Sequence, residues 1–483
     1  MKKRSMISLL ILTSLIFASC GEASPDVITD STTDSETTAE PESTVISDDL
    51  PDIDFEGREF RILTCDYLLD DYSADEENGG LMNDTIYRRN RTVEDRFGVN
   101  ITTLSPGDYG TTNTTAKSSI LSGEDEFDLV INHMIDNSNL AVSSLFADFN
   151  SIDYVSPEKP WWNDSAYENL SIDGHVWLMV GDISPYFLRY NYVVYFNKRL
   201  TDEYSIDEDA LYSDAMAGKW TIDRYSELTK DIWRDLNGNN EADEEDLYGL
   251  TAQVSSYVTP FIYSFGETTV KKDENDIAKL AMDAEKFSAI TEKVYKLIYE
   301  QQGTLPSKNW TLHSDTFIDG RAVFMNGVLA HSIEYFTDMK DDYGILPYPK
   351  WDEAQEEYYT MSDGSAPLIA IPKTVKDTDF VGIITEALAY ESYMNVTPVL
   401  YETALKVRGA RDEQSLAVID LAVRCGVVDF GFVFGDYKMM GFTLYELMPK
   451  KNPNFASYYA SNKDKWEARI ESIVDAALGE GAE

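Results

Sequence analysis

The sequence predicts an α/β protein built from doubly wound units, and three observations support this. Residues 59–132 read as strand, helix, strand, helix and strand, the alternation of a parallel sheet with crossover helices. The third strand, Phe127–Asn132, is a continuous apolar run, as expected of a strand buried on both faces. The chain beyond its N-terminal segment has about 430 residues, which corresponds to two or three units of typical domain size.

The first unit opens with a strand at Glu59–Thr64. A helix follows over Leu81–Phe97, because its apolar side chains recur on one side and Gly98 supplies a stop signal. Val99–Leu104 alternates as a strand does, and Thr111–Ser122 is the second helix. The apolar third strand completes the unit.

The chain after residue 175 combines short strands with longer helices. The clearest helix is Ile277–Gln302, which carries Phe287, Ile290 and Val294 on one side and is followed by Gly303. The remaining strands are expected at Val176–Val180, Tyr192–Asn197, Ala322–Asn326, Tyr343–Leu346 and Leu368–Ile371, and the remaining helices at Trp220–Leu236, Phe380–Tyr393 and Lys463–Leu478.

The first twenty residues have the organisation of an export signal. Residues 1–4 are basic, Ser5–Phe17 is a short apolar run, and small residues precede Cys20. A cysteine at this point resembles the lipobox of bacterial lipoproteins, although Phe17 stands where an aliphatic residue is usual. We therefore expect residues 1–20 to be a lipoprotein signal peptide with Cys20 as the lipidation site. An ordinary secretory signal that contains a cysteine is the alternative.

Residues 21–53 read as a disordered acidic tether rich in Ser and Thr. Up to residue 52 the segment has no Lys, Arg or aromatic residue, a composition that cannot bury enough apolar surface to fold. Such a segment is flexible and repels itself. Behind a lipidated cysteine, it would hold the folded body on the extracellular face of the cell membrane.

The charge of the chain restricts its partners. It has 40 Lys and Arg against 86 Asp and Glu, a formal net charge of -46. A surface of this sign repels phosphate backbones, so we expect no nucleic-acid partner. Beyond Cys20 the chain has Cys65 and Cys425, which could pair, but we expect both to be free and structural.

The most regular local motif is an acidic loop at residues 235–246. Its oxygen-bearing side chains have the spacing of an EF-hand-type calcium loop, and it resembles the calcium loop of dockerins. Asn240 stands where Gly is usual, and Asn tolerates the left-handed conformation better than most residues. We expect one structural Ca²⁺ here, with an acidic solvated turn as the alternative. The ligands would be Asp235, Asn237, Asn239, Asp243 and Asp246, together with the backbone carbonyl of Glu241.

A series of fragments along the body points to a family. In order they are FRIL, IYRRNRTVEDRFGV, FDLVI, ADFNSIDYV, PWWN, DGHVWLMVGDIS, YVVYFNKRL, FIDGRAVFMNG, YGILPYPK and PLIAIPK. In this order they resemble the family 1, carbohydrate-type extracellular solute-binding lipoproteins of bacterial ABC importers, the class that includes maltose-binding protein. The resemblance covers essentially all of residues 54–483.

The resemblance implies the two-lobed periplasmic-binding-protein-like fold of type II, with hinged α/β lobes around a central cleft. Ligands of open α/β sheets bind beyond the carboxyl ends of the strands, and two lobes can close over them about a few hinge residues. The first lobe would comprise residues 54–185 and 358–398, the second 188–356 and 400–483, with crossings near Ser184–Tyr190, Lys350–Tyr358 and Val396–Tyr401.

The function implied by the resemblance is capture without chemistry. The protein, expected to be a monomer, would bind a carbohydrate, expected to be an oligosaccharide, and deliver it to the subunits of an ABC permease. Aromatic rings stack on the apolar faces of a sugar, and polar side chains pair with its hydroxyls. The chain has 8 Trp and 30 Tyr, although aromatic residues mostly fill cores.

Candidate ligand-binding residues lie in loops after the predicted strands. Trp161 and Trp162 are adjacent between Pro160 and Asn163, and in an extended chain they could not both point into one core. We therefore expect one of them to be exposed to a partner or to the cleft. Asp182 lies at the first crossing, where proteins of this kind often place a sugar-binding acid. The full candidate set is Asp66, Tyr67, His133, Trp161, Trp162, Asp182, Tyr186, Asn326 and Asp363, the last in a Gly-containing loop with Ser365.

Two other classes of function remain open. A surface glycoside hydrolase would need two carboxylates flanking a cleft, and the chain is rich in acids. However, it shows no nucleophile elbow, no metal-binding His pair and no Gly-rich phosphate loop, so we expect no enzyme. A scaffold lipoprotein of a glycan-degrading assembly is suggested by the dockerin-like loop, but a dockerin needs two such loops and this sequence has one.

Overall fold

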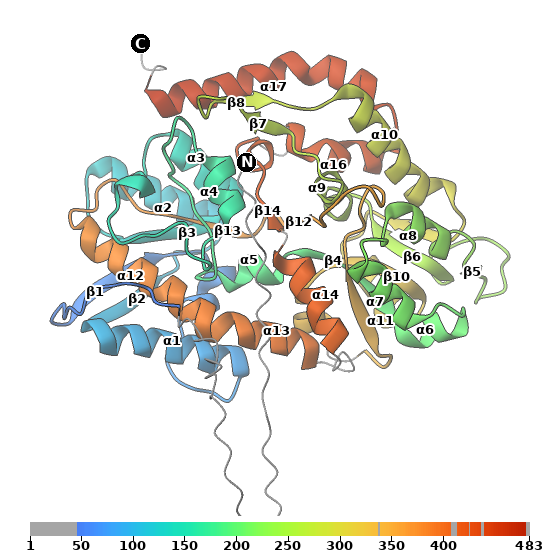
Figure 1. The fold of residues 1–483 in the computed structure, drawn as a ribbon, viewed down its shortest axis with the longest axis horizontal. Helices are drawn as coiled ribbons and strands as arrows, with labels where there is room; N and C mark the ends of the chain where they lie inside the picture. Colours follow the sequence, from blue (N-terminus) through green and yellow to red (C-terminus); the bar gives the residue numbers. More distant parts are fainter. Residues whose placement is uncertain (1–45, 337–338, 407–412, 425, 436–438, 480–483) are drawn as a thin grey trace, which may run out of the picture. The chain divides into compact units, whose positions relative to one another are not determined.

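Two sheets, each flanked by helices, organise the chain (Figure 1). The computed structural model describes residues 46–479 except 337–338, 407–412, 425 and 436–438. From Asp48 onward the chain forms one unit. Cys20, Cys425 and most of the predicted tether lie outside the described residues, whereas Cys65 is buried and free, and burial raises the pKa of its thiol to about 11.

The first sheet has the strand order β13-β3-β1-β2. Strand β1 is parallel to β2 and β3, and β13 is antiparallel to β3. In Figure 1, α2 and α3 lie on one side of this sheet, and α1 and α12 lie on the other. The elements are β1 (Arg58–Leu63), α1 (Leu81–Phe97), β2 (Val99–Leu104), α2 (Tyr109–Ser122), β3 (Leu129–His133), α3 (Met134–Val142), β13 (Pro367–Ala370) and α12 (Thr378–Glu391).

The second sheet has the order β11-β4-β10-β6-β5, and β9 also pairs with β6. Strands β9 and β10 are parallel to β6, and β4 is antiparallel to both β10 and β11. The strands are β4 (Tyr192–Asn197), β5 (Trp233–Arg234), β6 (Leu247–Gln253), β9 (Thr304–Ser307), β10 (Ala322–Val328) and β11 (Tyr343–Pro347), and the helices packed on them are α6 (Lys198–Glu203), α7 (Glu208–Met216), α8 (Ile222–Thr229), α11 (Leu312–Ile318) and α14 (Glu413–Arg424).

Shorter elements and a long C-terminal helix complete the fold. Helix α17 packs against α10 and against the β7–β8 hairpin. The elements are α4 (Asp164–Leu170), α5 (Pro185–Arg189), α9 (Pro260–Ser264), β7 (Val270–Lys272), β8 (Ala278–Leu280), α10 (Ala284–Tyr295), β12 (Thr360–Met361), α13 (Thr397–Lys406), β14 (Gly426–Val427), α15 (Phe430–Val433), α16 (Thr443–Leu447) and α17 (Phe455–Leu478), with short helical turns η1 (Asp66–Asp71), η3 (Ser256–Val258) and η5 (His331–Tyr335).

Most predicted elements of the first unit are confirmed, and several later ones differ. The predicted helix Trp220–Leu236 ends at Thr229, because Trp233 and Arg234 pair with β6 as strand β5. The predicted helix Ile277–Gln302 begins only at Ala284, because the preceding residues form β8 and the Asp283 side chain caps the helix by accepting from the backbone N–H of Lys286. Helix α17 begins before the predicted Lys463, and Val176–Val180 forms only an isolated bridge through Met179.

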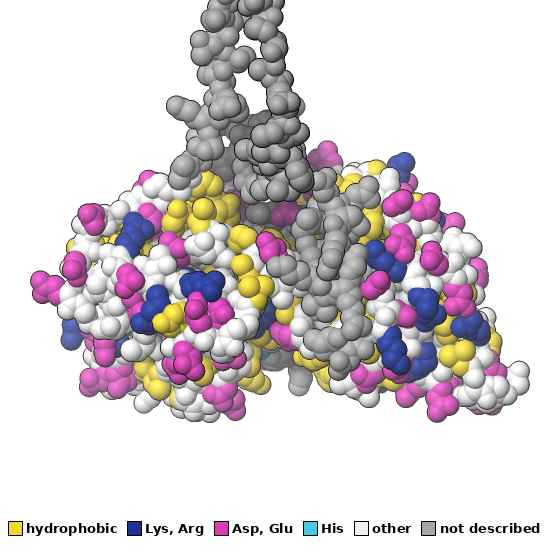
Figure 2. Space-filling view, turned by 90° about the horizontal axis from the view of Figure 1, so that it is seen from below, with side chains coloured by type: hydrophobic (Ala, Val, Ile, Leu, Met, Phe, Trp, Pro, Cys, Tyr) yellow, Lys and Arg dark blue, Asp and Glu magenta, His cyan; other side chains and the backbone are white. Residues whose placement is uncertain are grey.

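The sheets occupy different stretches of the chain. The first uses residues 58–133 and 367–370, and the second uses residues 192–347. The limits of the predicted lobes, 54–185 with 358–398 and 188–356 with 400–483, stay a prediction. Acidic side chains are spread over the face in Figure 2, with Lys and Arg scattered among them. Within the described ranges, no helix has both the length and the apolar character needed to cross a membrane.

Candidate ligand-binding site

A hollow of about 210 Å³ lies where strands of both sheets end. His133 ends β3, and the chain leaving β6 and β9 supplies Ser256 and Trp310. The antiparallel strands begin at the same edge, because Pro367 of β13 pairs with His133 and Tyr192 of β4 pairs with the last residue of β10. This is the position at which open α/β sheets bind ligands.

The turn at residues 363–365 supplies the polar side of the hollow. The Asp363 carboxylate accepts hydrogen bonds from the Ser365 backbone N–H at 3.0 Å, from the Ser365 hydroxyl at 2.7 Å and from the Tyr192 hydroxyl. The Tyr67 hydroxyl donates to the Ser365 carbonyl at 2.6 Å, and the Tyr186 hydroxyl lies 3.2 Å from Ser365 Oγ. Burial raises the pKa of Tyr186 to about 12, so its phenol stays neutral. Ser365 therefore joins three predicted site residues.

Aromatic side chains form the apolar side of the hollow. Trp310 exposes 55% of its surface, more than any other tryptophan among the described residues. Phe432 and Phe442 stack with ring centroids 4.5 Å apart, and Tyr445 meets the edge of Phe442. All four line the hollow. An exposed indole beside buried rings provides a flat apolar surface for a ligand.

Of the predicted residues, His133, Asp363, Tyr67 and Tyr186 lie in or around this hollow. His133 Nδ1 lies 3.1 Å from the Asp136 carboxylate, and its ring stacks on Tyr109 at 4.8 Å. The ring is therefore flanked by a carboxylate on one side and by an aromatic ring on the other.

The short helix α5, at the first predicted crossing, is held by charges from both sheets. The Arg189 guanidinium donates to Asp71 at 2.7 Å and to Glu334 at 3.2 Å. Asp71 ends η1, which follows β1 of the first sheet, and Glu334 lies in η5, which follows β10 of the second. The ring of Tyr186 stacks on Tyr190 with centroids 3.9 Å apart. Helix α5 therefore contacts the helical turns that follow a strand of each sheet, and also the 363–365 turn.

Asn326 and Asp66 are not part of the hollow. The Asn326 side chain is buried, accepting from Tyr225 at 2.8 Å and donating to Tyr348 at 3.0 Å, so it links β10 to helix α8 and to the chain after β11. Asp66 is exposed and accepts a hydrogen bond from the Ser105 hydroxyl.

The premise that Trp161 and Trp162 cannot both enter one core is wrong. Both side chains are buried, and their indole N–H groups donate to opposite oxygens of Glu386 at 3.0 and 2.9 Å. The chain turns at residues 157–161 instead of running extended, so consecutive side chains can enter the same core. Burial raises the pKa of Glu386 to about 7.

Trp162 and Asp182 line a different hollow, of about 680 Å³. Its walls include residues of all three predicted crossings. Asp182 accepts a hydrogen bond from the Thr397 hydroxyl at 2.7 Å. The predicted residues therefore divide between the strand-end hollow and this crossing hollow.

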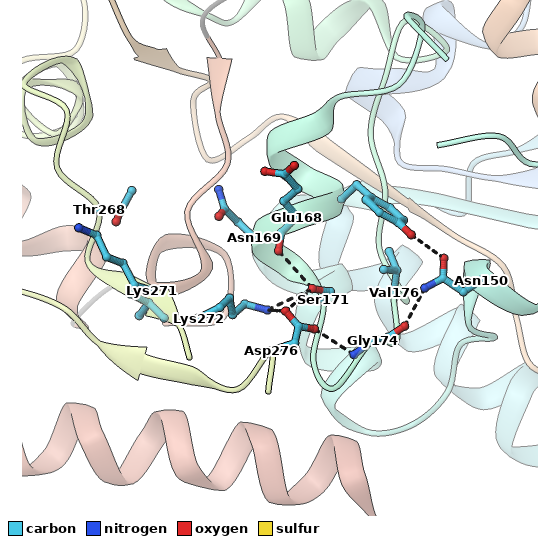
Figure 3. Close-up of a pocket in the computed structure, with 12 residues that line it drawn as sticks. Asn150, Glu168, Asn169, Ser171, Gly174, Val176, Thr268, Lys271, Lys272 and Asp276 are labelled. Atoms are coloured by element: carbon cyan, nitrogen blue, oxygen red, sulfur yellow. Dashed lines mark hydrogen bonds and ion pairs between the residues drawn. The ribbon is translucent and has the colours of Figure 1, made fainter. Parts of the chain in front are cut away.

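A third hollow, of about 610 Å³, lies beside the β7–β8 hairpin (Figure 3). Asp276 accepts from the Ser171 hydroxyl and the Gly174 backbone N–H, both at 2.9 Å. Lys272 Nζ lies 3.3 Å from Ser171 Oγ and from Asp276, and burial lowers its pKa. These polar groups form hydrogen bonds with one another and hold the hairpin against the loop after α4. No predicted site residue lies among them.

The predicted calcium loop forms the tip of the β5–β6 hairpin. Asn240 has a φ of 60°, the left-handed conformation expected at this position. Asp235 accepts from the backbone N–H groups of Gly238 and Asn240, and Asp246 is buried and accepts from the indole of Trp233 at 3.0 Å. Across the described residues, no three His, Cys, Asp or Glu side chains converge where a metal could sit.

Sequence reasoning missed most of the aromatic side of the hollow. Trp310 follows β9, a four-residue strand that the sequence pattern did not indicate. Tyr192 is the first residue of a correctly predicted strand and was not among the candidate site residues. A signal was present in the density of aromatic residues in the stretch 430–445, which contains six of them.

Comparisons with solved structures identify the fold. UgpB from Mycobacterium tuberculosis, in complex with glycerophosphocholine, matches with a TM-score of 0.52 and 13% identity over 87% of this chain and 99% of its own. A cyclo/maltodextrin-binding protein complexed with maltotetraose matches with a TM-score of 0.52 and 13% identity over 88% of this chain and 97% of its own. A family 1 extracellular solute-binding protein from Bifidobacterium longum subsp. infantis matches with a TM-score of 0.50 and 12% identity over 88% of this chain and 100% of its own.

The chain has the fold of the family 1 solute-binding proteins. The predicted two-lobed α/β class is therefore confirmed. No family model and no curated protein matches the sequence. At identities of 12–14% the likeness establishes the fold, and the ligand has to be argued from the side chains.

Proposed function

We propose that the protein is an extracellular solute-binding lipoprotein that captures a carbohydrate, expected to be an oligosaccharide, and delivers it to the permease of an ABC importer. The observation that carries this proposal is the strand-end hollow, which combines an exposed indole with a hydrogen-bonding turn at the ligand position of the fold. Cys20 would carry the lipid, and residues 21–53 would tether the body to the membrane.

The side chains of the hollow suit a sugar. Trp310 offers a flat surface to the C–H face of a pyranose ring, and Asp363 and Ser365 offer partners to its hydroxyls. A buried polar group left without its partner costs about 1–3 kcal/mol, so such a site discriminates between solutes that differ by one hydroxyl. Closure about the crossings would then exclude water from the bound sugar.

Two features favour capture over hydrolysis. Asp363 is the one carboxylic acid among the described residues that line the hollow, whereas glycoside hydrolysis uses a pair. Among the solved structures with this fold, one is described as a cyclo/maltodextrin-binding protein complexed with maltotetraose and one as a solute-binding protein, and UgpB is in complex with glycerophosphocholine. Their ligands differ, so the fold leaves the solute open.

The experiment is a thermal-shift and calorimetric screen of mono- and oligosaccharides on the mature protein. Trp310→Ala should weaken the binding of a sugar hit by about tenfold or more, because a stacking aromatic contributes on the order of 1–3 kcal/mol. Tyr154→Ala removes another exposed ring and is the matched control, which should bind as the wild type does. Turnover of the sugar, or the absence of any sugar hit, would overturn the proposal.

We also propose that the loop at residues 235–246 binds one structural Ca²⁺. The left-handed Asn240 supports this, since the residue at that position must turn the loop sharply. The Asn237 and Asn239 amides donate to Asp243, so their side chains would have to rotate to present oxygen to a cation.

A further inference from the structure

The charge of Asp363 is not compensated within the strand-end hollow. The half-buried carboxylate accepts from three neutral donors, the Tyr192 hydroxyl and two groups of Ser365. No Lys or Arg occurs among the described residues that line the hollow. The one basic side chain there, His133, faces the carboxylate of Asp136 at 3.1 Å.

The negative charge acts through the surrounding side chains. Burial is the main cause of the raised pKa values of Tyr192 and Tyr257, and the charge of Asp363 raises them further. A carboxylate has about four lone-pair positions, of which the known donors occupy three. Asp363 therefore retains acceptor capacity for a donor group on a ligand.

The walls of the hollow also favour a positively charged ligand. Five aromatic side chains line it, and the face of an aromatic ring carries partial negative charge that attracts cations. The volume of about 210 Å³ suits one sugar ring or a group of similar size. The net charge of -46 on the whole chain also draws cations toward the protein and repels anions. The five rings are Tyr192, Trp310, Phe432, Phe442 and Tyr445.

The geometry points to a ligand with a positively charged amino group, held by Asp363 within the aromatic walls. Resting on the proposed carbohydrate function, this assigns an amino sugar, free or as one unit of an oligosaccharide, to the hollow. The ammonium group would donate to the open position of Asp363, and the sugar ring would lie against Trp310. Acidic sugars and phosphorylated solutes are excluded, since they would place a second negative charge beside Asp363.

The experiment compares matched sugars by calorimetry, at a pH where the free amines are protonated. Glucose, glucosamine and N-acetylglucosamine form one set, and the galactose and mannose series form two more. At least one amine should bind roughly tenfold to hundredfold more tightly than its hydroxyl and N-acetyl counterparts, the range for a hydrogen bond to a charged group. Its dissociation constant should also rise with ionic strength.

Asp363→Asn keeps the shape of the side chain and removes its charge, so it should abolish the preference for the amine. Asp342→Asn removes an equal charge from an exposed loop residue and should leave the preference intact. Neutral sugars that bind as tightly as the amines, or a preference that survives in Asp363→Asn, would overturn the assignment while leaving the carbohydrate function standing. If neither amines nor neutral mono- and oligosaccharides bind, both proposals fail.

Discussion

Ionisation of Glu386 should lower the stability of the protein as the pH rises to neutrality. Burial raises the pKa of this carboxyl from 4.5 to about 7, although the indoles of Trp161 and Trp162 donate to it. The unfolded chain has the ordinary value, so between pH 4.5 and 7 the folded state binds more protons. The stability from this group is therefore present below pH 4.5 and is lost as the pH rises to about 7. The difference between the two pKa values corresponds to about 3 kcal/mol.

Glu386→Gln isolates this effect, because it preserves the size of the side chain and cannot ionise. The free energy of unfolding should be measured by urea titration for both proteins between about pH 5 and pH 8. The wild-type value minus the variant value should fall by about 2–3 kcal/mol across this range, since the other titrating groups cancel in the difference. Glu124→Gln removes an exposed carboxylate that does not act on Glu386 and controls for the loss of one negative charge.

A wild-type minus variant difference that stays constant between pH 5 and 8 would refute the reasoning. The carboxylate would then be as well solvated in the folded protein as in the unfolded chain. Tryptophan fluorescence offers a second measurement, because Trp161 and Trp162 both contact the titrating group. Their emission should change with a midpoint near pH 7 in the wild type and not in the variant.

Three further predictions concern the backbone, a buried histidine and the acidic loop. Gly303→Ala should destabilise the protein by about 1–3 kcal/mol, because a Cβ there would lie 1.8 Å from the Thr229 carbonyl oxygen, whereas Gly110→Ala in α2 meets no such contact and should not lower the melting temperature. Burial lowers the pKa of His331 from 6.5 to about 4, so the stability that its neutral form contributes above pH 6.5 is lost as the pH falls toward 4. In urea titrations the His331→Phe variant should therefore lose less stability than the wild type over that pH interval. Calcium should raise the melting temperature and a chelator should lower it, and equal melting curves with and without chelator would count against an occupied loop at residues 235–246.

The elements of the first sheet were predicted well because their signals, apolar spacing and a terminating glycine, lie within each segment. Helix α1 was placed at its observed bounds, since its apolar residues recur with helical spacing and Gly98 adopts the left-handed conformation that ends a helix. Strand β5 could not be predicted in the same way. It has two residues and exists because it pairs with β6, so the helical pattern of the preceding segment was extended too far.

The candidate site was predicted in part, for a similar reason. The rule that ligands bind beyond strand ends selected His133, which lines the hollow, whereas the 363–365 loop, which also lines it, precedes a predicted strand and was chosen for its Gly and polar residues. The rule could not bring in Trp310, whose strand was too short to recognise, nor the rings of the C-terminal region, which reach the hollow through long-range packing. The tryptophan pair misled because a turn, unlike an extended strand, lets neighbouring side chains share one core.

Helix α5 is anchored in two directions: Tyr186 contacts Ser365, and Arg189 bridges carboxylates that follow strands of different sheets. Rotation of one sheet against the other would therefore strain the contacts of this helix, and the turn that presents Asp363 would be displaced with it. Conversely, a solute that immobilises Asp363 would narrow the angular freedom of the two sheets. Under the proposed function, the ligand-bound protein would therefore differ from the free protein in stiffness as well as in shape.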